Sequence, residues 1–220
     1  MKKAIVLVSG GMDSCVTASC AKKDGCQLSF LHINYGQRTE RRELKSFNDI
    51  AIFFNVKEKL VVDMNYFNHI GGSCLTDLKI PVPKDNIDNH EIPVSYVPFR
   101  NANILSVATS WAEIIKAKII YIGAVEEDSS GYPDCRRSFY DAFEKTIKEG
   151  TKPETSIKIM TPLINLYKKD IIKMGVELKS PLHLTWSCYE NGNEPCLKCD
   201  SCILRSRGFK QADITDPILT

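Results

Sequence analysis

The stretch Ser9-Gly10-Gly11-Met12-Asp13-Ser14 follows directly on an apolar run at residues 4–8 and leads into a helix-prone segment. That order predicts a buried strand, a glycine turn and a helix that starts near Ser14. Gly10 and Gly11 can adopt positive φ and bring backbone N–H groups close to an anion, while the helix directs its unpaired amides to the same place. The predicted phosphate-binding residues are Val8, Ser9, Gly10, Gly11, Met12, Asp13 and Ser14.

A serine–glycine turn with an Asp13 or Ser14 helix cap has the same composition, so the turn alone does not decide between a cap and a nucleotide site. The run lacks the Gly-Lys-Ser/Thr of a P-loop and the third glycine of a dinucleotide fingerprint, which disfavours those two folds. Ser-Gly-Gly-x-Asp-Ser instead resembles the PP-loop of ATP pyrophosphatases, which split ATP between its α and β phosphates. We therefore expect ATP, with Asp13 helping to hold Mg²⁺ on its phosphates.

The bulk composition is that of an ordinary soluble protein. The 220 residues are 43% hydrophobic and 25% charged, which predicts one sizeable core with a small appendage. The net charge of +2 provides no overall field to recruit nucleic acid, and we expect no nucleic-acid partner.

The cellular location is predicted from the N-terminus and the cysteines. The first apolar run ends at Ser9, short of the ~7–15 residues of a signal peptide, and no run approaches the ~18 residues that span a bilayer. Nine cysteines is an odd number, which favours reduced thiols over a disulfide framework. We therefore expect a cytoplasmic protein without a membrane partner.

β-rich runs at residues 28–34, 59–63 and 118–123 follow the first strand, with helical patterns between them. Such alternation predicts an α/β fold, a doubly wound and mostly parallel sheet with helices on both faces. Two apolar stripes at helical spacing are interpreted as core. Their members are Leu44, Phe47, Ala51 and Phe54 in one helix, and Leu105, Ala108, Trp111, Ala112 and Ile115 in the other.

Two further segments interrupt this alternation. Residues 71–103 are polar and broken by prolines, and we expect a lid or substrate loop there. After a Gly/Pro linker at residues 150–154, a short strand and a helix are predicted within residues 161–176. The expected organisation is a nucleotide and substrate domain at residues 1–180 and a small C-terminal zinc-binding segment at residues 181–220.

Four of the nine cysteines, Cys188, Cys196, Cys199 and Cys202, lie within fifteen residues in the pattern C-x7-C-x2-C-x2-C. This spacing favours one tetrahedral Zn²⁺ with all four positions filled by protein, hence a structural role. An iron–sulfur cluster is the main alternative, because the last three match the start of a ferredoxin run. That run needs a cysteine where this chain has Ser206. Disulfides or unligated thiols are the remaining alternative.

Planar hydrogen-bonding side chains gather in the loops expected after the strands, at residues 34–38, 97–101 and 126–137. Guanidinium groups suit carboxylates and phosphates, tyrosine offers a stacking face, and aspartate can bond the amino edge of a purine. Because these loops share one edge of the predicted sheet, we interpret them as a substrate site. Its candidate residues are Arg38, Arg100, Asn101, Asp128, Tyr132, Asp134 and Arg136.

Together these segments resemble the 7-cyano-7-deazaguanine synthase family, PP-loop enzymes that make a queuosine precursor. The resemblance covers nearly the whole chain. The matching stretches are residues 9–14, 35–38, 98 with 100–101, 128 with 130–136, 161–163 with 168, and 185–189 running into the cysteine triplet. The chain departs from the family pattern at Phe99 and Leu197, where glycine is expected, and at Thr39, where histidine is common.

The resemblance implies conversion of 7-carboxy-7-deazaguanine and ammonia to the 7-cyano product with ATP. AMP transfer to the carboxylate oxygen would make a leaving group, ammonia would displace AMP to give an amide, and a second activation would allow loss to the nitrile. Asp13 and Lys168 are the predicted catalytic residues, and Lys168 is the second cation. Cys135 is interpreted as a packed or ligand-lining thiol.

Two alternatives stay open from the residues alone. A PP-loop tRNA sulfur-transferase would need a basic surface for tRNA and a reactive cysteine. A zinc-bearing ATP-binding module would bind ATP without releasing AMP. We expect small-molecule partners, free ammonium as the nitrogen source, and a homodimer only as a hypothesis.

Overall fold

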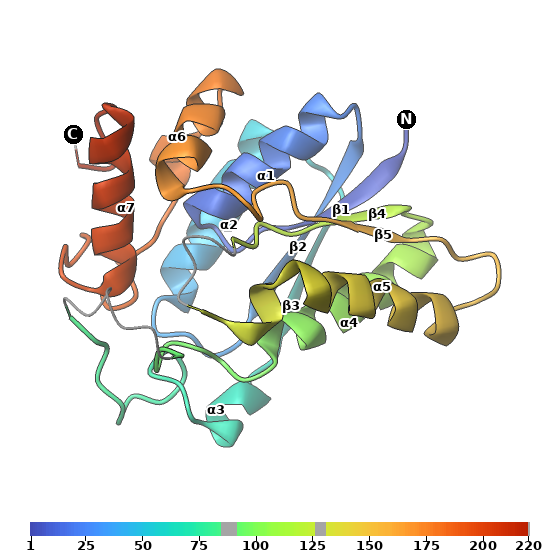
Figure 1. Ribbon diagram of the computed structural model, residues 1–220, viewed down its shortest axis with the longest axis horizontal. Helices are drawn as coiled ribbons and strands as arrows, with labels where there is room; N and C mark the ends of the chain where they lie inside the picture. The colour runs from blue at the N-terminus through green and yellow to red at the C-terminus, as the bar shows by residue number, and fades with distance from the viewer. Residues whose placement is uncertain (85–91, 126–130, 220) are drawn as a thin grey trace.

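The computed structural model describes residues 1–84, 92–125 and 131–219 (Figure 1). Asp128, one of the predicted substrate residues, lies outside these described residues. Within them, no helix combines the length and the apolar character that crossing a membrane would require.

Five strands form one parallel sheet in the order β3-β2-β1-β4-β5. The strands are β1 Lys3–Leu7, β2 Gln27–Asn34, β3 Lys59–Asp63, β4 Ile119–Tyr121 and β5 Lys158–Met160. The order reverses at β1, between its neighbours β2 and β4. The strand order confirms the predicted fold class. In a doubly wound sheet this switch point creates a crevice at the carboxyl ends of the strands, where ligands are expected to bind.

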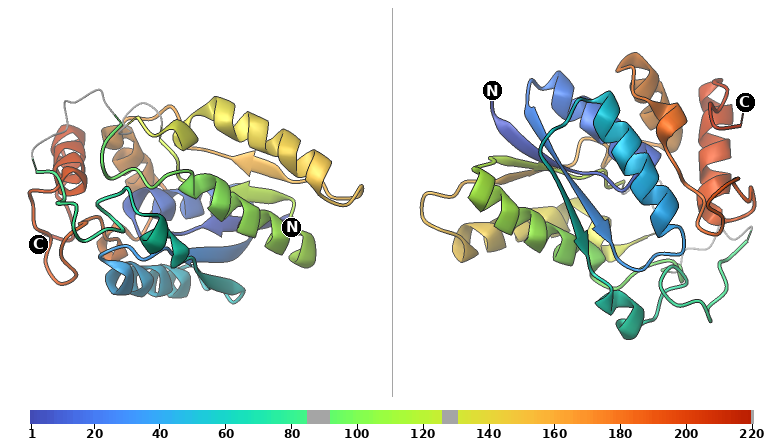
Figure 2. Two further views of the ribbon diagram at one scale, coloured as in Figure 1. Left: turned by 90° about the horizontal axis from the view of Figure 1, so that it is seen from below. Right: turned by 180° about the vertical axis from the view of Figure 1, so that it is seen from behind.

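Helices cover both faces of the sheet. They are α1 Met12–Lys23, α2 Glu40–Phe53, α3 Tyr66–Ile70, α4 Arg100–Ile115, α5 Arg137–Gly150, α6 Lys168–Glu177 and α7 Asp200–Ala212, with single 3-10 turns η1 Pro133–Cys135 and η2 Leu182–Leu184. α1 and α2 pack on one face and α4 and α5 on the other, so the sheet lies between two helix layers (Figure 2). α6 and α7 lie side by side beyond α1, next to the C-terminus (Figure 1).

The first strand shows why the run at residues 4–8 is apolar throughout. Ala4 and Val6 pack with α1 and α2, whereas Ile5 and Leu7 pack with α4 on the opposite face. A central strand covered on both faces needs apolar side chains at every position rather than at alternate ones.

The two predicted helical stripes are confirmed as core. Phe47 and Ala51 of α2 are buried against one face of the sheet. Leu105, Ala108 and Ala112 of α4 are buried against the other. These stripes therefore hold the helices on the sheet and leave the ligand chemistry to the loops.

Two boundaries differ from the sequence prediction. α1 begins at Met12 rather than near Ser14, and its cap is Gly11, with neither Asp13 nor Ser14 as a side-chain cap. The short strand expected within residues 161–176 instead occupies Lys158–Met160, and α6 alone falls in that range. Only Ile159 of β5 is buried, so this strand lacks a hydrophobic pattern long enough to predict.

Candidate active site

The glycine turn connects β1 to α1 through residues 8–11. Gly10 has a φ of +92°, and a Cβ atom there would lie 2.5 Å from the backbone oxygen of Glu43. Both the left-handed conformation and this close approach require glycine. The Gly11 N–H donates to Ser9 Oγ at 3.2 Å, and the Ser14 hydroxyl donates to the Gly11 carbonyl at 2.9 Å. These bonds hold the turn beneath the N-terminus of α1.

A cavity of about 330 Å³ opens at this turn. Its walls come from the ends of β1 and β2, from the residues that follow β4, from the first turns of α1, α2, α4 and α6, from α7, and from Trp186, Ser187 and Tyr189. Because α1 points its N-terminal amides and the positive end of its dipole at one wall, that wall suits an anion. The cavity thus lies at the switch point of the sheet, where its order predicts a ligand.

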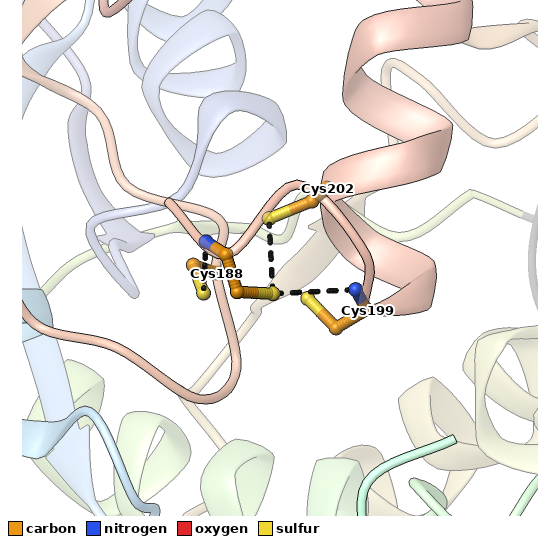
Figure 3. A group of neighbouring side chains, drawn as sticks. Cys188, Cys199 and Cys202 are labelled. Atoms are coloured by element: carbon orange, nitrogen blue, oxygen red, sulfur yellow. Dashed lines mark hydrogen bonds between the residues drawn. The ribbon is translucent and has the colours of Figure 1, made fainter. Parts of the chain in front are cut away.

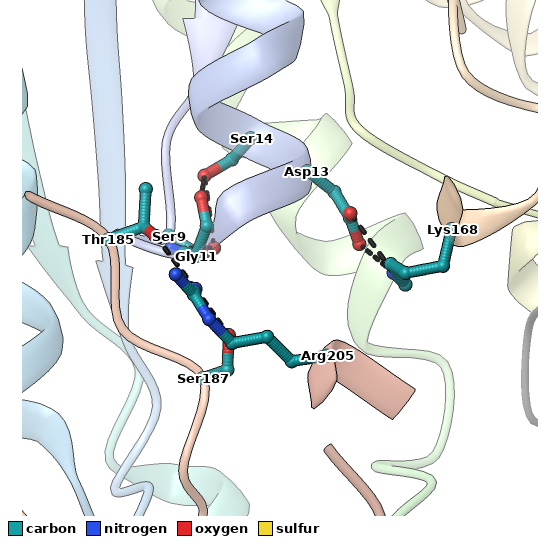
Figure 4. A network of polar contacts seen from close by, with 8 residues as sticks. All are labelled: Ser9, Gly11, Asp13, Ser14, Lys168, Thr185, Ser187 and Arg205. Atoms are coloured by element: carbon teal, nitrogen blue, oxygen red, sulfur yellow. Dashed lines mark hydrogen bonds and ion pairs between the residues drawn. The ribbon is translucent and has the colours of Figure 1, made fainter. Parts of the chain in front are cut away.

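Asp13 and Lys168 both line this cavity, and their side chains form an ion pair (Figure 4). Lys168 Nζ lies 3.0 Å and 2.9 Å from the two carboxylate oxygens of Asp13. The stem of Lys168 is packed by α7, because a Cβ atom at Gly208 would lie 2.5 Å from Lys168 Cγ. The pair therefore places an acid and a cation next to the glycine turn.

Arg100 provides a second cation in the lining of the cavity. Its Nη1 donates to the Tyr35 hydroxyl at 3.0 Å, and its guanidinium lies 5.0 Å from the Tyr35 ring centroid. Burial alone lowers the pKa of Arg100, but Tyr35, Tyr132, Asp134 and Cys135 raise it by more, so its net pKa is raised. Arg100 is thus a fixed positive charge that can bind a carboxylate or a phosphate.

The C-terminal segment closes the cavity from the side of α7. Arg205 donates to both carboxylate oxygens of Asp216, at 2.7 Å and 2.8 Å. It also donates to Thr185 Oγ1 at 2.8 Å (Figure 4). The backbone N–H of Trp186 donates to the Gly10 carbonyl at 2.9 Å. The position of the glycine turn is therefore fixed in part by the chain that leads into the cysteines.

Cys188, Cys196, Cys199 and Cys202 form one cluster, with all four Sγ atoms within 4.8 Å of one another. Cys188 lies on the loop after η2, and Cys199 and Cys202 lie at the start of α7 (Figure 3). A tetrahedral Zn²⁺ with Zn–S bonds of about 2.3 Å separates its sulfurs by about 3.8 Å. The 4.0 Å between Cys196 and Cys202 Sγ fits that value. The donor set and its geometry are those of a metal site.

Backbone amides support the same sulfurs. The N–H groups of Asn191 and Cys196 donate to Cys188 Sγ at 3.3 Å and 3.4 Å, and the Cys199 N–H donates to Cys196 Sγ at 3.3 Å. Such bonds stabilise thiolates and orient them toward a common centre, as outer-shell partners of metal ligands do.

The family profile described as "Queuosine biosynthesis protein QueC" matches residues 3–213. The chain belongs to the QueC family. A 7-cyano-7-deazaguanine synthase from Chlorobium chlorochromatii is 55% identical over 216 residues, which cover 98% of this chain and 95% of that protein. The synthase of the same name from Nautilia profundicola is 53% identical over 218 residues, covering 99% and 98%. The predicted family is thereby confirmed.

Solved structures similar to this QueC-family chain share its fold. A 4-thiouridine synthetase, solved with RNA and bound ATP, superposes with a TM-score of 0.56 at 17% identity, over 96% of this chain and 50% of that one. A predicted tRNA methyltransferase subunit from Methanocaldococcus jannaschii superposes with a TM-score of 0.53 at 18% identity, over 80% and 75%. At these identities the likeness shows the architecture alone.

The structure brings most of the predicted site residues of this QueC-family protein to one place. Among the described residues, the cavity is lined by Val8, Ser9, Gly11, Met12, Asp13, Ser14, Arg100, Asn101, Tyr132 and Lys168, together with the thiol-bearing Cys135. Gly10 lies in the same turn and supports it from behind. Burial raises the pKa of Cys135 to about 11, so this thiol stays protonated at neutral pH.

Three predicted substrate residues do not line the cavity. Arg38 donates to the backbone carbonyls of Cys74, Asp77 and Ile80 at 2.7–3.1 Å, and so anchors the loop after α3. Asp134 is buried and accepts the Asn101 N–H at 2.9 Å, which satisfies an otherwise free amide in the first turn of α4. Arg136 is exposed between η1 and α5.

Several cavity residues were not predicted from the sequence. Glu43 comes from the first turn of α2, Trp186 and Tyr189 from the loop before the cysteine triplet, and Arg205 from α7. Glu43 follows Arg38 by five positions and lies in α2, a helix whose sequence pattern is dominated by its apolar stripe. Its place at the start of a helix that follows a strand was the available signal.

The departures at Phe99 and Leu197 fall where the backbone is left-handed. Phe99 has a φ of +56° and Leu197 a φ of +60°, which is the conformation that glycine adopts without strain. The third departure, Thr39, is buried and donates to Glu43 Oε1 at 2.7 Å. Each departure thus has a local structural meaning.

Proposed function

We propose that this chain converts 7-carboxy-7-deazaguanine and ammonia to 7-cyano-7-deazaguanine with ATP, through an adenylated carboxylate and an adenylated amide. The observation that carries the proposal is a single cavity in which the glycine turn, the Asp13–Lys168 pair and Arg100 face a common space. The close relatives that bear the synthase name support the same reaction for this chain.

The chemistry calls for activation because a carboxylate is a poor electrophile. Its oxygen attacks the α-phosphorus of ATP, pyrophosphate leaves, and the resulting acyl adenylate has AMP as a leaving group. Ammonia then displaces AMP to give the amide. Adenylation of the amide oxygen, followed by loss of AMP and of the remaining N–H protons, gives the nitrile.

The residues of the turn would stabilise the departing pyrophosphate. Gly11 and the first amides of α1 would donate to its oxygens, with the Ser9 hydroxyl beside them. Asp13 would hold Mg²⁺, which offsets the phosphate charge when bound, and Lys168 would supply a further positive charge to the α-phosphate. In this proposal the ion pair of Asp13 and Lys168 exchanges its mutual contact for contacts with the nucleotide.

Aromatic and planar groups that also line the cavity suit the deazaguanine ring. Tyr132 and Tyr189 offer ring faces, and Arg100 is the arginine placed to bind the substrate carboxylate. Arg38 and Arg136 are the other predicted arginines, and their positions favour roles in loop structure or at the surface. Asp134 would act through Asn101, which lines the cavity.

The cysteine cluster would hold structural Zn²⁺. Four protein ligands leave no open position, so the ion would fix the chain that supports Gly10 rather than take part in the reaction. We further propose that residues 181–220 act as a zinc-binding segment on a domain of residues 1–180, in a cytoplasmic enzyme that forms a homodimer and uses no nucleic acid.

The test is incubation of the purified protein with 7-carboxy-7-deazaguanine, ATP, Mg²⁺ and ammonium, followed by mass detection of the nitrile and of the released nucleotide. The proposal predicts the nitrile together with AMP. AMP formation without nitrile, or binding of ATP without either product, would contradict it. Thiolated tRNA would point to the sulfur-transferase alternative, which the protonated Cys135 disfavours.

A further inference from the structure

Glu43 is a carboxylate on the wall of the cavity that the adenylation steps described above do not use. It lies in the first turn of α2, and its backbone carbonyl packs against Gly10 of the phosphate-binding turn. Glu43 lines the same cavity as Asp13 and Arg100, and the charge on Arg100 acts on its carboxyl group. Among the described residues, Asp13 and Glu43 are the two carboxylates of this lining.

The two carboxylates have different partners. Asp13 is held by the cation Lys168, whereas the partners of Glu43 are neutral. Thr39 Oγ1 donates to Glu43 Oε1 at 2.7 Å, and Gln37 Nε2 donates to Glu43 Oε2 at 3.1 Å. In the described part of the chain, no lysine or arginine lies within ion-pair distance of Glu43.

The surroundings of Glu43 increase its affinity for a proton. Burial raises the pKa of this carboxyl, against the opposing effects of the Thr39 and Gln37 hydrogen bonds and of the charge on Arg100. The charged and titratable groups that face it are Arg100 from α4, Tyr35 after β2 and Glu40 from α2. A carboxylate of this kind is a better base than an exposed one.

The reaction needs such a group because ammonium predominates at neutral pH, and ammonium has no electron pair with which to attack carbon. We infer that Glu43 binds ammonium in this cavity and accepts its proton, while Thr39 positions the carboxylate. The inference rests on the proposed function. It adds to that function the capture and deprotonation of the nitrogen substrate.

The step balances with the groups already named. An N–H bond of ammonium breaks, its proton passes to a carboxylate oxygen of Glu43, and its electron pair stays on nitrogen. That pair forms the C–N bond with the acyl carbon, and the C–O bond to AMP breaks with its pair leaving on AMP. The nitrogen then releases a second proton to solvent, which yields the neutral amide.

The first test separates adenylation from nitrogen transfer in the Glu43→Gln variant. We expect carboxylate-dependent exchange of labelled pyrophosphate into ATP to stay within about twofold of the wild type, because it needs no ammonium. Amide formation should fall about 10²- to 10⁴-fold, the range for loss of a general base. Hydroxylamine, which is largely neutral at neutral pH, should still yield hydroxamate at near wild-type rate.

Three outcomes decide this test. Wild-type amide formation by Glu43→Gln would overturn the inference, and so would an equal loss of exchange, amide and hydroxamate, which would indicate a structural role. Selective loss of amide formation supports it. If the wild type shows no exchange, the proposed function itself fails, and that failure is distinct from the failure of the role of Glu43.

The second test uses the positioning residue. Thr39→Val removes the hydroxyl bond to Glu43 Oε1, so the carboxyl should gain proton affinity, and the acid limb of the pH profile of amide formation should move to higher pH. Thr146→Val is the matched control, because Thr146 is exposed on α5 and donates to the Ala142 carbonyl within that helix. An unmoved acid limb in Thr39→Val would overturn the positioning role.

Discussion

Lys168 Nζ lies 3.0 Å and 2.9 Å from the two carboxylate oxygens of Asp13, which joins the first residue of α6 to the first turn of α1 in the cavity that the glycine turn also lines. The Asp13 side chain is 29% exposed and that of Lys168 14%. An ion pair that solvent reaches contributes little to folding. Its position therefore points to a role in ligand binding rather than in stability.

We predict that Asp13→Ala loses most turnover yet folds and retains its metal. Lys168→Met should lower turnover by about 10²-fold, as expected when one preorganised charge at a transition state is removed. Lys169→Met is the control, because Lys169 is exposed beside Tyr167 and should behave as the wild type. The measurement is nitrile formation, with circular dichroism and metal content in parallel. Unchanged ATP-dependent turnover in Asp13→Ala would refute the PP-loop assignment.

A substitution at Gly208 tests the position of Lys168 without changing Lys168 itself. A Cβ atom at Gly208 would lie 2.5 Å from Lys168 Cγ and 2.9 Å from Ile172 Cδ1, so Gly208→Ala must displace the Lys168 stem or separate α7 from α6. We expect a cost of about 1–3 kcal/mol in unfolding free energy, together with reduced turnover. Gly150→Ala is the control, because no atom lies within 4 Å of a Cβ there. If both variants keep wild-type stability and turnover, the packing account of Lys168 is wrong.

The buried pair of Arg205 and Asp216 should be costly to break. Both side chains are about nineteen-twentieths buried, with exposed fractions of 4% and 5%, and Asp216→Asn would leave the Arg205 charge uncompensated. We predict a loss of about 3–5 kcal/mol in urea unfolding. Asp141→Asn, which breaks the exposed pair with Arg137, should cost less than about 1 kcal/mol. Equal effects of the two variants would contradict this reasoning.

Removal of the metal should increase hydrogen exchange in the segment that bonds the glycine turn. Chelation or mild acid should release one zinc per chain, because ligand thiolates must be deprotonated. Hydrogen exchange should then rise over residues 186–209, including the Trp186 N–H that bonds the Gly10 carbonyl. Elemental analysis that finds iron would overturn the zinc assignment, and unchanged exchange at Trp186 would disprove the coupling to the turn.

Leu197, which lies between Cys196 and Cys199 and has a left-handed backbone, offers a stabilising substitution. Leu197 has a φ of +60° and is 56% exposed, so Leu197→Gly relieves backbone strain of about 1 kcal/mol at the cost of little buried surface. Leu78→Gly is the matched control, because Leu78 is 75% exposed and has no positive φ. The thermal unfolding temperature of the metal-loaded protein should rise for Leu197→Gly and fall for Leu78→Gly. A lower unfolding temperature for Leu197→Gly would disprove the strain.

The features predictable from the sequence are those encoded by neighbouring residues. The turn at Gly10, the apolar stripes of the helices and the cysteine spacing each combine a local pattern with one physical requirement. The three-residue strand β5 was misplaced because only Ile159 is buried in it. A local pattern therefore has to be long enough, as well as local, to predict an element.

The rest of the site depends on tertiary packing. Arg38 resembles a ligand-binding arginine in the sequence, yet its partners are carbonyls more than thirty positions away. In the sequence, nothing distinguishes Glu43 from the other members of the 27 acidic residues. Only the fold places it in the lining of the cavity. Arg205 and Asp216 share no recognisable spacing, and only the packing of α7 pairs them.

The most direct test of the central claim follows the oxygen atoms of the substrate carboxylate. With heavy oxygen at both carboxylate positions of 7-carboxy-7-deazaguanine, transfer of the α-phosphorus to those oxygens predicts one heavy atom in every AMP released during nitrile formation. Unlabelled AMP, or label recovered in inorganic phosphate together with ADP, would contradict adenylation in this cavity.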